Sequence, residues 1–215
     1  MDNNGLQSLL QFAPPPLRPP AVHPPNDKSW RAVETHFGFE LPPDYKLLIE
    51  HYGTGCWGGF LQIFNPFSRN RYNNQRLIIE NSHLLCVEEP DPPSSHPEFL
   101  RAWNLFRSAA RARRAASPYD FYPARPGLFP WAQGTDEAVT LYWLVSGEPS
   151  SWQTIVERWS DGPTFDQRFE VGSSAFLLSW LQNSIRPAAF PEAARSAKGW
   201  FEPWILHDVE LTDLG

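Results

Sequence analysis

The sequence predicts an α+β fold, a single domain in which helices flank a central antiparallel (or mixed) sheet of about four to six strands. The first half of the chain is dominated by windows with helical spacing of apolar residues. The second half contains short segments that are rich in β-branched and aromatic residues and separated by turn residues. With 215 residues, of which 41% are hydrophobic, the chain can bury one substantial core.

The chain divides into three parts. Residues 1–27 are expected to form a flexible arm, because prolines cluster between Pro14 and Pro25 and favour an extended conformation. Residues 28–186 form the predicted domain, with a helical insertion at about 90–118. Residues 187–215 are expected to be a tail that docks on the domain through its aromatic residues Trp200, Phe201 and Trp204.

Two short helices open the domain. The first carries an apolar stripe and is expected to end at Gly38, a residue that tolerates a left-handed conformation. The second begins at Pro42 and Pro43, which suit a first helical turn, and ends at Gly53. The stripe of the first helix is Trp30, Val33 and Phe37, and that of the second is Tyr45, Leu48, Ile49 and Tyr52.

The remaining elements follow from periodicity and composition. The strongest strand signal is the strict alternation of apolar and polar residues after the Ser160–Pro163 turn. The predicted strands are Phe60–Phe64, Glu137–Val145, Trp152–Trp159 and Thr164–Val171. The predicted helices are Asn73–Val87, a long helix before Ser117, and a closing helix with Leu177, Leu181 and Ile185.

Composition restricts the class of partner. The net charge of −6 disfavours nucleic-acid binding, which needs a basic surface, and favours attraction to a basic protein. Two cysteines are too few for a disulfide framework. The N-terminus does not resemble a signal peptide and no apolar run is long enough to span a membrane, so a cytoplasmic location without membrane association is expected.

Motifs for cofactors are weak. Gly53, Gly55 and Gly58 spell the G-x-G-x-x-G dinucleotide fingerprint, but a helix precedes them and a strand follows, the reverse of the required order. These glycines are expected to turn the backbone from helix to strand. His83 and Cys86 have the spacing of a metal-ligand pair without a second pair to complete it. No cofactor and no metal are therefore predicted.

Charged clusters offer further candidates. The adjacent acids Asp136 and Glu137 are a candidate for acid–base catalysis, although acids in a turn are usually solvated. The acidic loop around residues 88–91 is interpreted in the same way. A stripe of arginines on the long helix is best explained as a solvated outer face, with an acidic partner or phosphates as the alternative. Its members are Arg107, Arg111 and Arg114.

The strongest candidate for a binding residue is Trp57. It lies among glycines, where a loop would leave its ring exposed, and exposed aromatic residues often anchor interfaces. The predicted partner-binding residues are Trp57, the neighbouring Tyr52, and the acids Asp136 and Glu137.

Two sets of motifs occur in a fixed order along the chain. The first half carries Trp30 and Glu34, a glycine, Leu-Pro-Pro-Asp-Tyr at 41–45 and Tyr-Gly-Thr-Gly at 52–55. The second half carries Leu-Phe-Pro-Trp at 128–131, then Gly134, Trp143, Trp152 and the closing strand and helix over Phe169–Leu181. Taken together, these motifs resemble the SUKH superfamily, the Smi1/Knr4-like proteins. The resemblance extends from Trp30 to Ile185, with the arginine-rich helix as an insertion.

That resemblance implies an α+β fold used for binding, without shared catalytic residues. Bacterial members are thought to be immunity proteins that neutralise polymorphic toxins, many of them nucleases. A cognate toxin, expected to be basic, is therefore the predicted partner. Two alternatives remain, a regulatory or scaffold protein of the Smi1/Knr4 kind and an unrecognised enzyme that uses Asp136 and Glu137.

Overall fold

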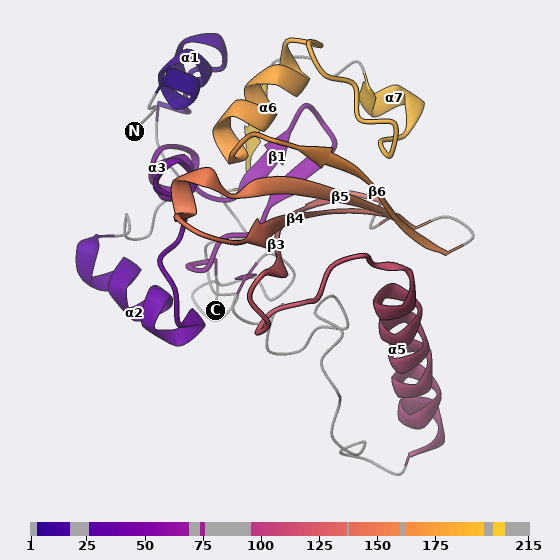
Figure 1. The fold of residues 1–215 in the computed structure, drawn as a ribbon. Helices are drawn as coiled ribbons and strands as arrows, with labels where there is room; N and C mark the ends of the chain where they lie inside the picture. Colours follow the sequence, from indigo (N-terminus) through magenta and orange to yellow (C-terminus); the bar gives the residue numbers. More distant parts are fainter. Residues whose placement is uncertain are drawn as a thin grey trace, which may run out of the picture.

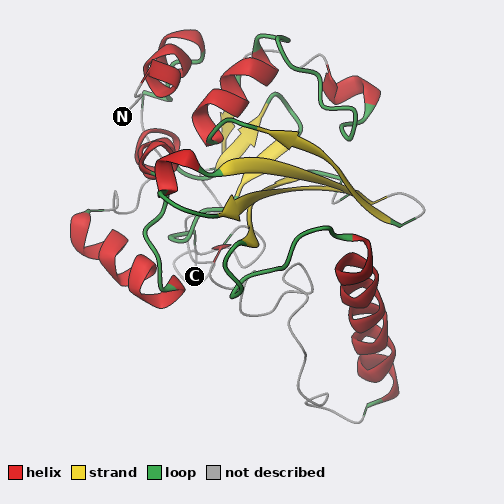
Figure 2. Ribbon diagram, viewed as in Figure 1, coloured by secondary structure: helices red, strands yellow, loops and turns green. Residues whose placement is uncertain are grey.

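An open antiparallel sheet with helices on both faces organises the chain (Figures 1 and 2). The computed structural model describes residues 4–17, 26–68, 74–75, 96–136, 138–159, 162–195 and 200–204. Within these ranges seven strands pair in the order β6-β5-β4-β3-β2-β1-β7. The α+β prediction is confirmed, and the sheet has more strands than the four to six expected.

The elements run as follows. The helices are α1 (Asn4–Phe12), α2 (Asp27–Phe37), α3 (Pro43–Tyr52), α5 (Pro97–Ala116), the 3₁₀ turn η2 (Pro149–Ser151), α6 (Ser173–Leu181) and α7 (Glu192–Arg195). The strands are β1 (Gly55–Trp57), β2 (Leu61–Ile63), β3 (Gly127–Gly134), β4 (Val139–Val145), β5 (Gln153–Trp159), β6 (Pro163–Phe169) and β7 (Phe201–Pro203). The helix predicted at Asn73–Val87 lies almost entirely outside the described residues.

The main core lies between the sheet and the helices α1, α2, α3 and α6. Alternate residues of β4 point to this face, and Trp143 stacks on Trp131 with ring centroids 5.9 Å apart. The intervening Tyr142 points to the opposite face, as the two-residue period of a strand requires. There it joins a smaller cluster closed by Ala110 of α5. The sheet therefore has two apolar faces, and α5 covers part of the second one (Figure 1).

The N-terminal arm differs from its prediction. Residues 4–12 form α1, whose Leu6 and Leu9 are fully buried, and α1 packs beside α6. The proline content of the flanking segment obscured a short amphipathic helix that the body of the protein covers. The prediction of a flexible arm over 1–27 is thus wrong for the described residues 4–17.

Residues near the C-terminus dock as predicted, and they do so by extending the sheet. β7 pairs antiparallel with β1 at the sheet edge, placing Phe201 opposite Trp57. The backbone N–H of Gly58 donates to the carbonyl of Trp200 at 2.9 Å, and that of Trp204 to Thr54 at 3.0 Å. The tail therefore completes the sheet that the first half of the chain begins.

Candidate functional site

Trp57, the residue expected to anchor a partner, is buried. It lies on β1 with 1% of its surface exposed, its ring 4.5 Å from that of Tyr52 and 4.9 Å from that of Phe201. The expectation of an exposed ring in a loop was wrong, because β7 arrives from the far end of the chain and covers it. Trp57 is a core residue, and no surface contact can be assigned to it.

Tyr52 is equally unavailable. It is 1% exposed at the end of α3, and its hydroxyl donates to the carbonyl of Ala13 at 2.6 Å. Burial raises the pKa of the phenol well above its usual value, so it remains a neutral donor. Its role is to fasten the segment after α1 to α3.

Of the two acids predicted as contact residues, Asp136 and Glu137, the structure describes only Asp136. Asp136 is exposed in the turn between β3 and β4, where its carboxylate accepts a hydrogen bond of 3.1 Å from the backbone of Ala138. Glu137 lies outside the described residues, as do His83, Cys86 and the acidic loop around 88–91. Asp136 stays a candidate contact residue at the surface.

The residues that carry the family resemblance hold the scaffold together. The Glu34 carboxylate accepts from the backbone of Leu41 at 2.9 Å and from the ammonium of Lys46 at 2.8 Å, which joins α2 to α3. The Tyr45 hydroxyl is buried and bonds the carbonyl of Phe64 and the side chain of Gln75. These motif residues therefore join elements of the fold to one another.

The glycines of the false dinucleotide motif also have structural roles. Gly53 ends α3 with φ of 69°, and a Cβ on Gly55 would lie 2.3 Å from the carbonyl oxygen of Glu202. β1 begins directly after α3, so the helix-to-strand turn expected from the sequence is confirmed. The motif lies at a tight turn and at the contact with β7.

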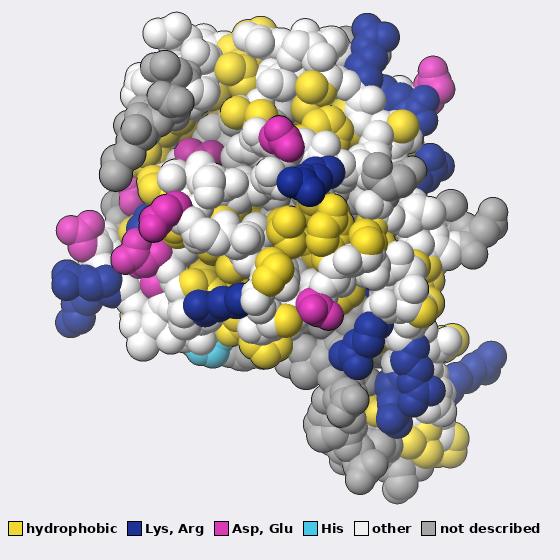
Figure 3. All heavy atoms as spheres, viewed as in Figure 1, with side chains coloured by type: hydrophobic (Ala, Val, Ile, Leu, Met, Phe, Trp, Pro, Cys, Tyr) yellow, Lys and Arg dark blue, Asp and Glu magenta, His cyan; other side chains and the backbone are white. Residues whose placement is uncertain are grey.

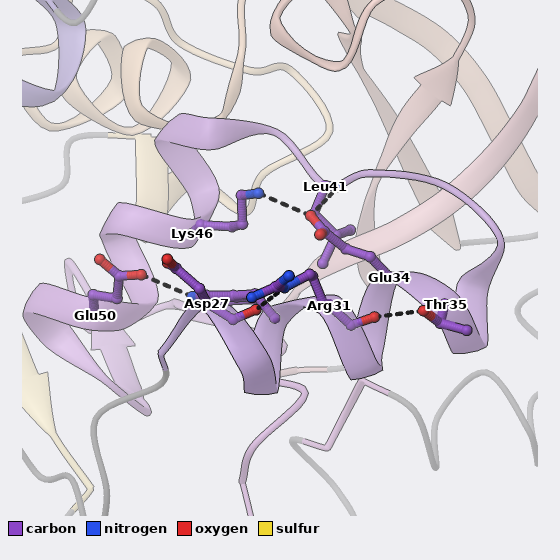
Figure 4. A network of polar contacts seen from close by, with 8 residues as sticks. Asp27, Arg31, Glu34, Thr35, Leu41, Lys46 and Glu50 are labelled. Atoms are coloured by element: carbon purple, nitrogen blue, oxygen red, sulfur yellow. Dashed lines mark hydrogen bonds and ion pairs between the residues drawn. The ribbon is translucent and has the colours of Figure 1, made fainter.

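A groove lies between α2 and α3, and a network of polar contacts crosses it (Figure 4). It has a volume of about 650 Å³. Its walls carry three carboxylates and two cations on an apolar floor, and its lining consists of Asp27, Trp30, Arg31, Glu34, Pro43, Lys46, Leu47 and Glu50. One cation, Lys46, is already paired with Glu34.

Two acids of this groove retain capacity for a partner. One oxygen of Glu50 accepts the indole N–H of Trp30 at 2.8 Å, which leaves the carboxylate its charge and its second oxygen. Asp27 is exposed, and its carboxylate has no side-chain partner within the described ranges. Such a pair of carboxylates on one groove can accept the guanidinium or ammonium group of a basic protein.

A second groove borders the loop that joins α2 to α3. Its volume is about 600 Å³, and Phe39, Arg125 and Trp152 form part of its wall. The Arg125 guanidinium lies 5.3 Å from the Phe39 ring and donates to the carbonyl of Gly38. The exposed acids Glu40 and Glu148 line this groove as well. The acidic α2–α3 surface, defined by Asp27, Glu34, Glu40, Glu50 and Glu148, thus spans both grooves.

Outside this surface, the buried carboxylate of Glu157 is held by hydrogen bonds to neighbouring side chains. Glu157 is 1% exposed and bonds the guanidinium of Arg113 at 2.5 Å and the hydroxyl of Tyr142 at 2.8 Å. Burial raises the pKa of its carboxyl, while Arg113, Tyr142 and Thr140 act in the opposite direction. Across the described segments, no group of three or more histidine, cysteine or acidic residues is placed to hold a metal ion.

Comparisons with known proteins add no relative. No protein-family model, curated protein or solved structure matches this chain. Within the part of the chain that the structure describes, no helix is long and apolar enough to cross a membrane. What the fold and the site define is an α+β domain with two surface grooves beside α2 and α3, whose linings together contain five carboxylates and three cations.

Proposed function

We propose that this chain is a protein-binding module that neutralises a basic protein toxin by covering the toxin's active site. The observation that carries the proposal is the acidic α2–α3 surface, which includes two grooves whose linings contain more carboxylates than cations. The resemblance to SUKH immunity proteins supports the same function. An inhibitor that covers the toxin's active site needs no reactive group of its own. The structural contacts of the motif residues are compatible with this mode of inhibition.

The physical basis is charge complementarity. A toxin that cleaves nucleic acid must present cations to phosphates, and an acidic inhibitor is attracted to those cations before contact. Binding to the cations then blocks the substrate's access. A stable inhibitory contact of about 1,600 Å² is larger than either groove, so surrounding residues of α2 and the β4–β5 turn would join it.

A regulatory role through the proline-rich arm is less well supported. α1 belongs to the core, and deletion of residues 1–27 would remove Leu6 and Leu9 from it. Loss of binding after that deletion would report a damaged fold. A valid test of the arm keeps residues 4–17 and replaces only the prolines that follow.

Co-expression with the toxin encoded beside the gene tests the function. The chain should restore growth, and survival equal to an empty vector would reject the proposal. The surface is tested separately, by measuring affinity for a catalytically inactive form of that toxin. Charge reversal at the exposed acids, in the variant Asp27→Lys/Glu40→Lys, should weaken binding about tenfold or more.

A matched control separates the surface from net charge. The variant Asp120→Lys/Glu170→Lys reverses two exposed acids on other elements and changes the net charge equally. It should retain nearly full affinity. Equal losses in the two double variants would reject the α2–α3 surface while leaving the neutralising function intact.

A further inference from the structure

Helix α5 has the opposite charge to the rest of the protein. Its sequence contains five arginines and one glutamate, in a chain whose net charge is −6. Figure 3 shows Lys and Arg side chains gathered where Figure 1 places α5. This separation of charge gives the molecule a second surface that differs from the acidic α2–α3 surface.

One end of α5 is fixed to the sheet. Arg113 bonds the buried Glu157, and its guanidinium lies 4.7 Å from the ring of Trp159 on β5. Ala110 packs in the second apolar cluster beside Phe165 of β6. Because these contacts hold the C-terminal half, the helix has a defined orientation relative to the sheet.

The remaining arginines face solvent. Arg101, Arg111 and Arg114 are exposed and Arg107 is half-buried, and none of them has an ion-pair partner within the described ranges. Arg101 and Arg111 are ten positions apart on one stripe, a separation of about 15 Å along the axis. A contiguous face, named here the α5 outer face, consists of Arg101, Asn104, Leu105, Ser108 and Arg111.

The α5 outer face is also partly apolar. Leu105 is 66% exposed, a large fraction for a leucine. With Pro97 and Leu100 it lines a shallow recess of about 540 Å³ that Arg101 and Asn104 complete. An apolar recess bordered by an arginine is a composition typical of protein interfaces, in which arginine is enriched.

We propose that the α5 outer face binds an acidic surface of a partner protein. Carboxylates would pair with the guanidinium groups of Arg101 and Arg111, and an apolar side chain would cover Leu105. Nucleic acid fits less well, since the acidic body of the chain repels phosphates and a sugar–phosphate backbone would leave Leu105 uncovered. The proposal rests on a different surface from the toxin-binding proposal and stands independently of it.

Fluorescence anisotropy with defined probes tests the chemistry of this surface. The probes are a labelled glutamate–leucine peptide, a polyglutamate peptide and a single-stranded oligonucleotide, all of equal charge. The full chain should bind the glutamate–leucine peptide most tightly, about tenfold more tightly than polyglutamate. Oligonucleotide binding equal to or tighter than peptide binding would overturn the proposal.

Substitutions then locate the binding. Arg101→Glu/Arg111→Glu should abolish binding of both peptides. Leu105→Ser should lower the affinity for the glutamate–leucine peptide and leave the affinity for polyglutamate unchanged. The control Lys28→Glu/Arg186→Glu makes the same charge change at two exposed positions outside α5 and outside the grooves, and it should bind normally. If the first variant does not fold, as judged by circular dichroism, Arg101→Gln/Arg111→Gln replaces it. Equal binding by all variants would reject the surface.

Sedimentation velocity completes the test. The proposal expects a monomer whose sedimentation is unaffected by Arg101→Glu/Arg111→Glu. A wild-type oligomer that this variant dissociates would mean that a second copy of the chain occupies the α5 outer face, which overturns binding to a separate acidic protein.

Discussion

The carboxylate of Asp44, in the first turn of α3, accepts a hydrogen bond of 2.8 Å from the backbone N–H of Ser174, in the first turn of α6. The residue that precedes α6, Gly172, has no side chain with which to cap it. Asp44 therefore supplies the cap from another helix. One negative charge lies at two helix N-termini, where the helix dipoles favour it.

Replacing Asp44 should lower stability. Asp44→Ala removes the cap and the charge at both N-termini, so the free energy of unfolding should fall by about 1–2 kcal/mol. Asp44→Asn keeps an acceptor oxygen and should cost less. Urea denaturation measures both changes. Asp120→Asn, at an exposed loop position, serves as control, and an Asp44→Ala variant as stable as this control would contradict the capping role.

The buried pair of Arg113 and Glu157 should dominate the attachment of α5. Arg113→Met leaves the Glu157 charge buried without its cation, and this should cost about 3–5 kcal/mol near neutral pH. The double variant Arg113→Met/Glu157→Leu removes both charges and should recover much of that loss. Thermal or urea unfolding of the single and double variants measures the effect, and equal destabilisation by both would contradict it.

The loss in free energy of unfolding caused by Arg113→Met should depend on pH. Burial raises the pKa of Glu157, and loss of Arg113 removes the largest opposing influence. The folded variant then binds a proton more readily than the unfolded chain, so its stability falls as pH rises from the ordinary glutamate pKa through the higher folded pKa. The stability difference from wild type should therefore be smaller at pH 5 than at pH 8. A difference independent of pH would contradict the burial of this carboxylate.

Cys56 should resist alkylation. Its thiol is 4% exposed on β1, and burial, followed by the charge of Glu202, raises its pKa to about 11. At pH 8 only about one thiol in a thousand would be ionised, against roughly a quarter for an ordinary cysteine. In a Cys86→Ser background, which leaves Cys56 alone, iodoacetamide should react far more slowly with the native chain than with chain unfolded in urea. Equal rates would contradict the buried position.

Gly55→Ala should displace β7. The added Cβ would lie 2.3 Å from the backbone oxygen of Glu202, so the strand must move away from β1 and uncover Trp57. Proteolysis near residues 200–204 should accelerate. Gly5→Ala is a suitable control, since its Cβ would make an ordinary 3.4 Å contact with the Cβ of Ala175 on α6. That control should be neutral or slightly stabilising, by up to about 1 kcal/mol.

Much of the local structure was predictable from sequence because it depends on neighbouring residues. The stripes of α2 and α3 and the glycine at the end of each of these two helices were predicted within a few residues. The strict alternation predicted for β6 was wrong, because its pairing with β5 shifts register and Phe165 joins the second apolar cluster while Phe169 packs against the main core. β1, β3 and β7 were not among the strands predicted from periodicity and composition. β1 and β7 have three residues each, too few to show a period, and they are stabilised by pairing with each other from distant parts of the chain. β3 contains Pro130, a residue that argues against a strand when the sequence is considered alone.

The site residues illustrate the same division. The sequence by itself determined the α+β class, the order of most elements and the acidic balance of the chain, because composition and short-range periodicity specify them. Only the tertiary structure decided that Trp57 is buried under Phe201, that α1 belongs to the core, and which arginines of α5 stay exposed. Exposure depends on which distant segment covers a residue, and a local pattern contains no record of that contact.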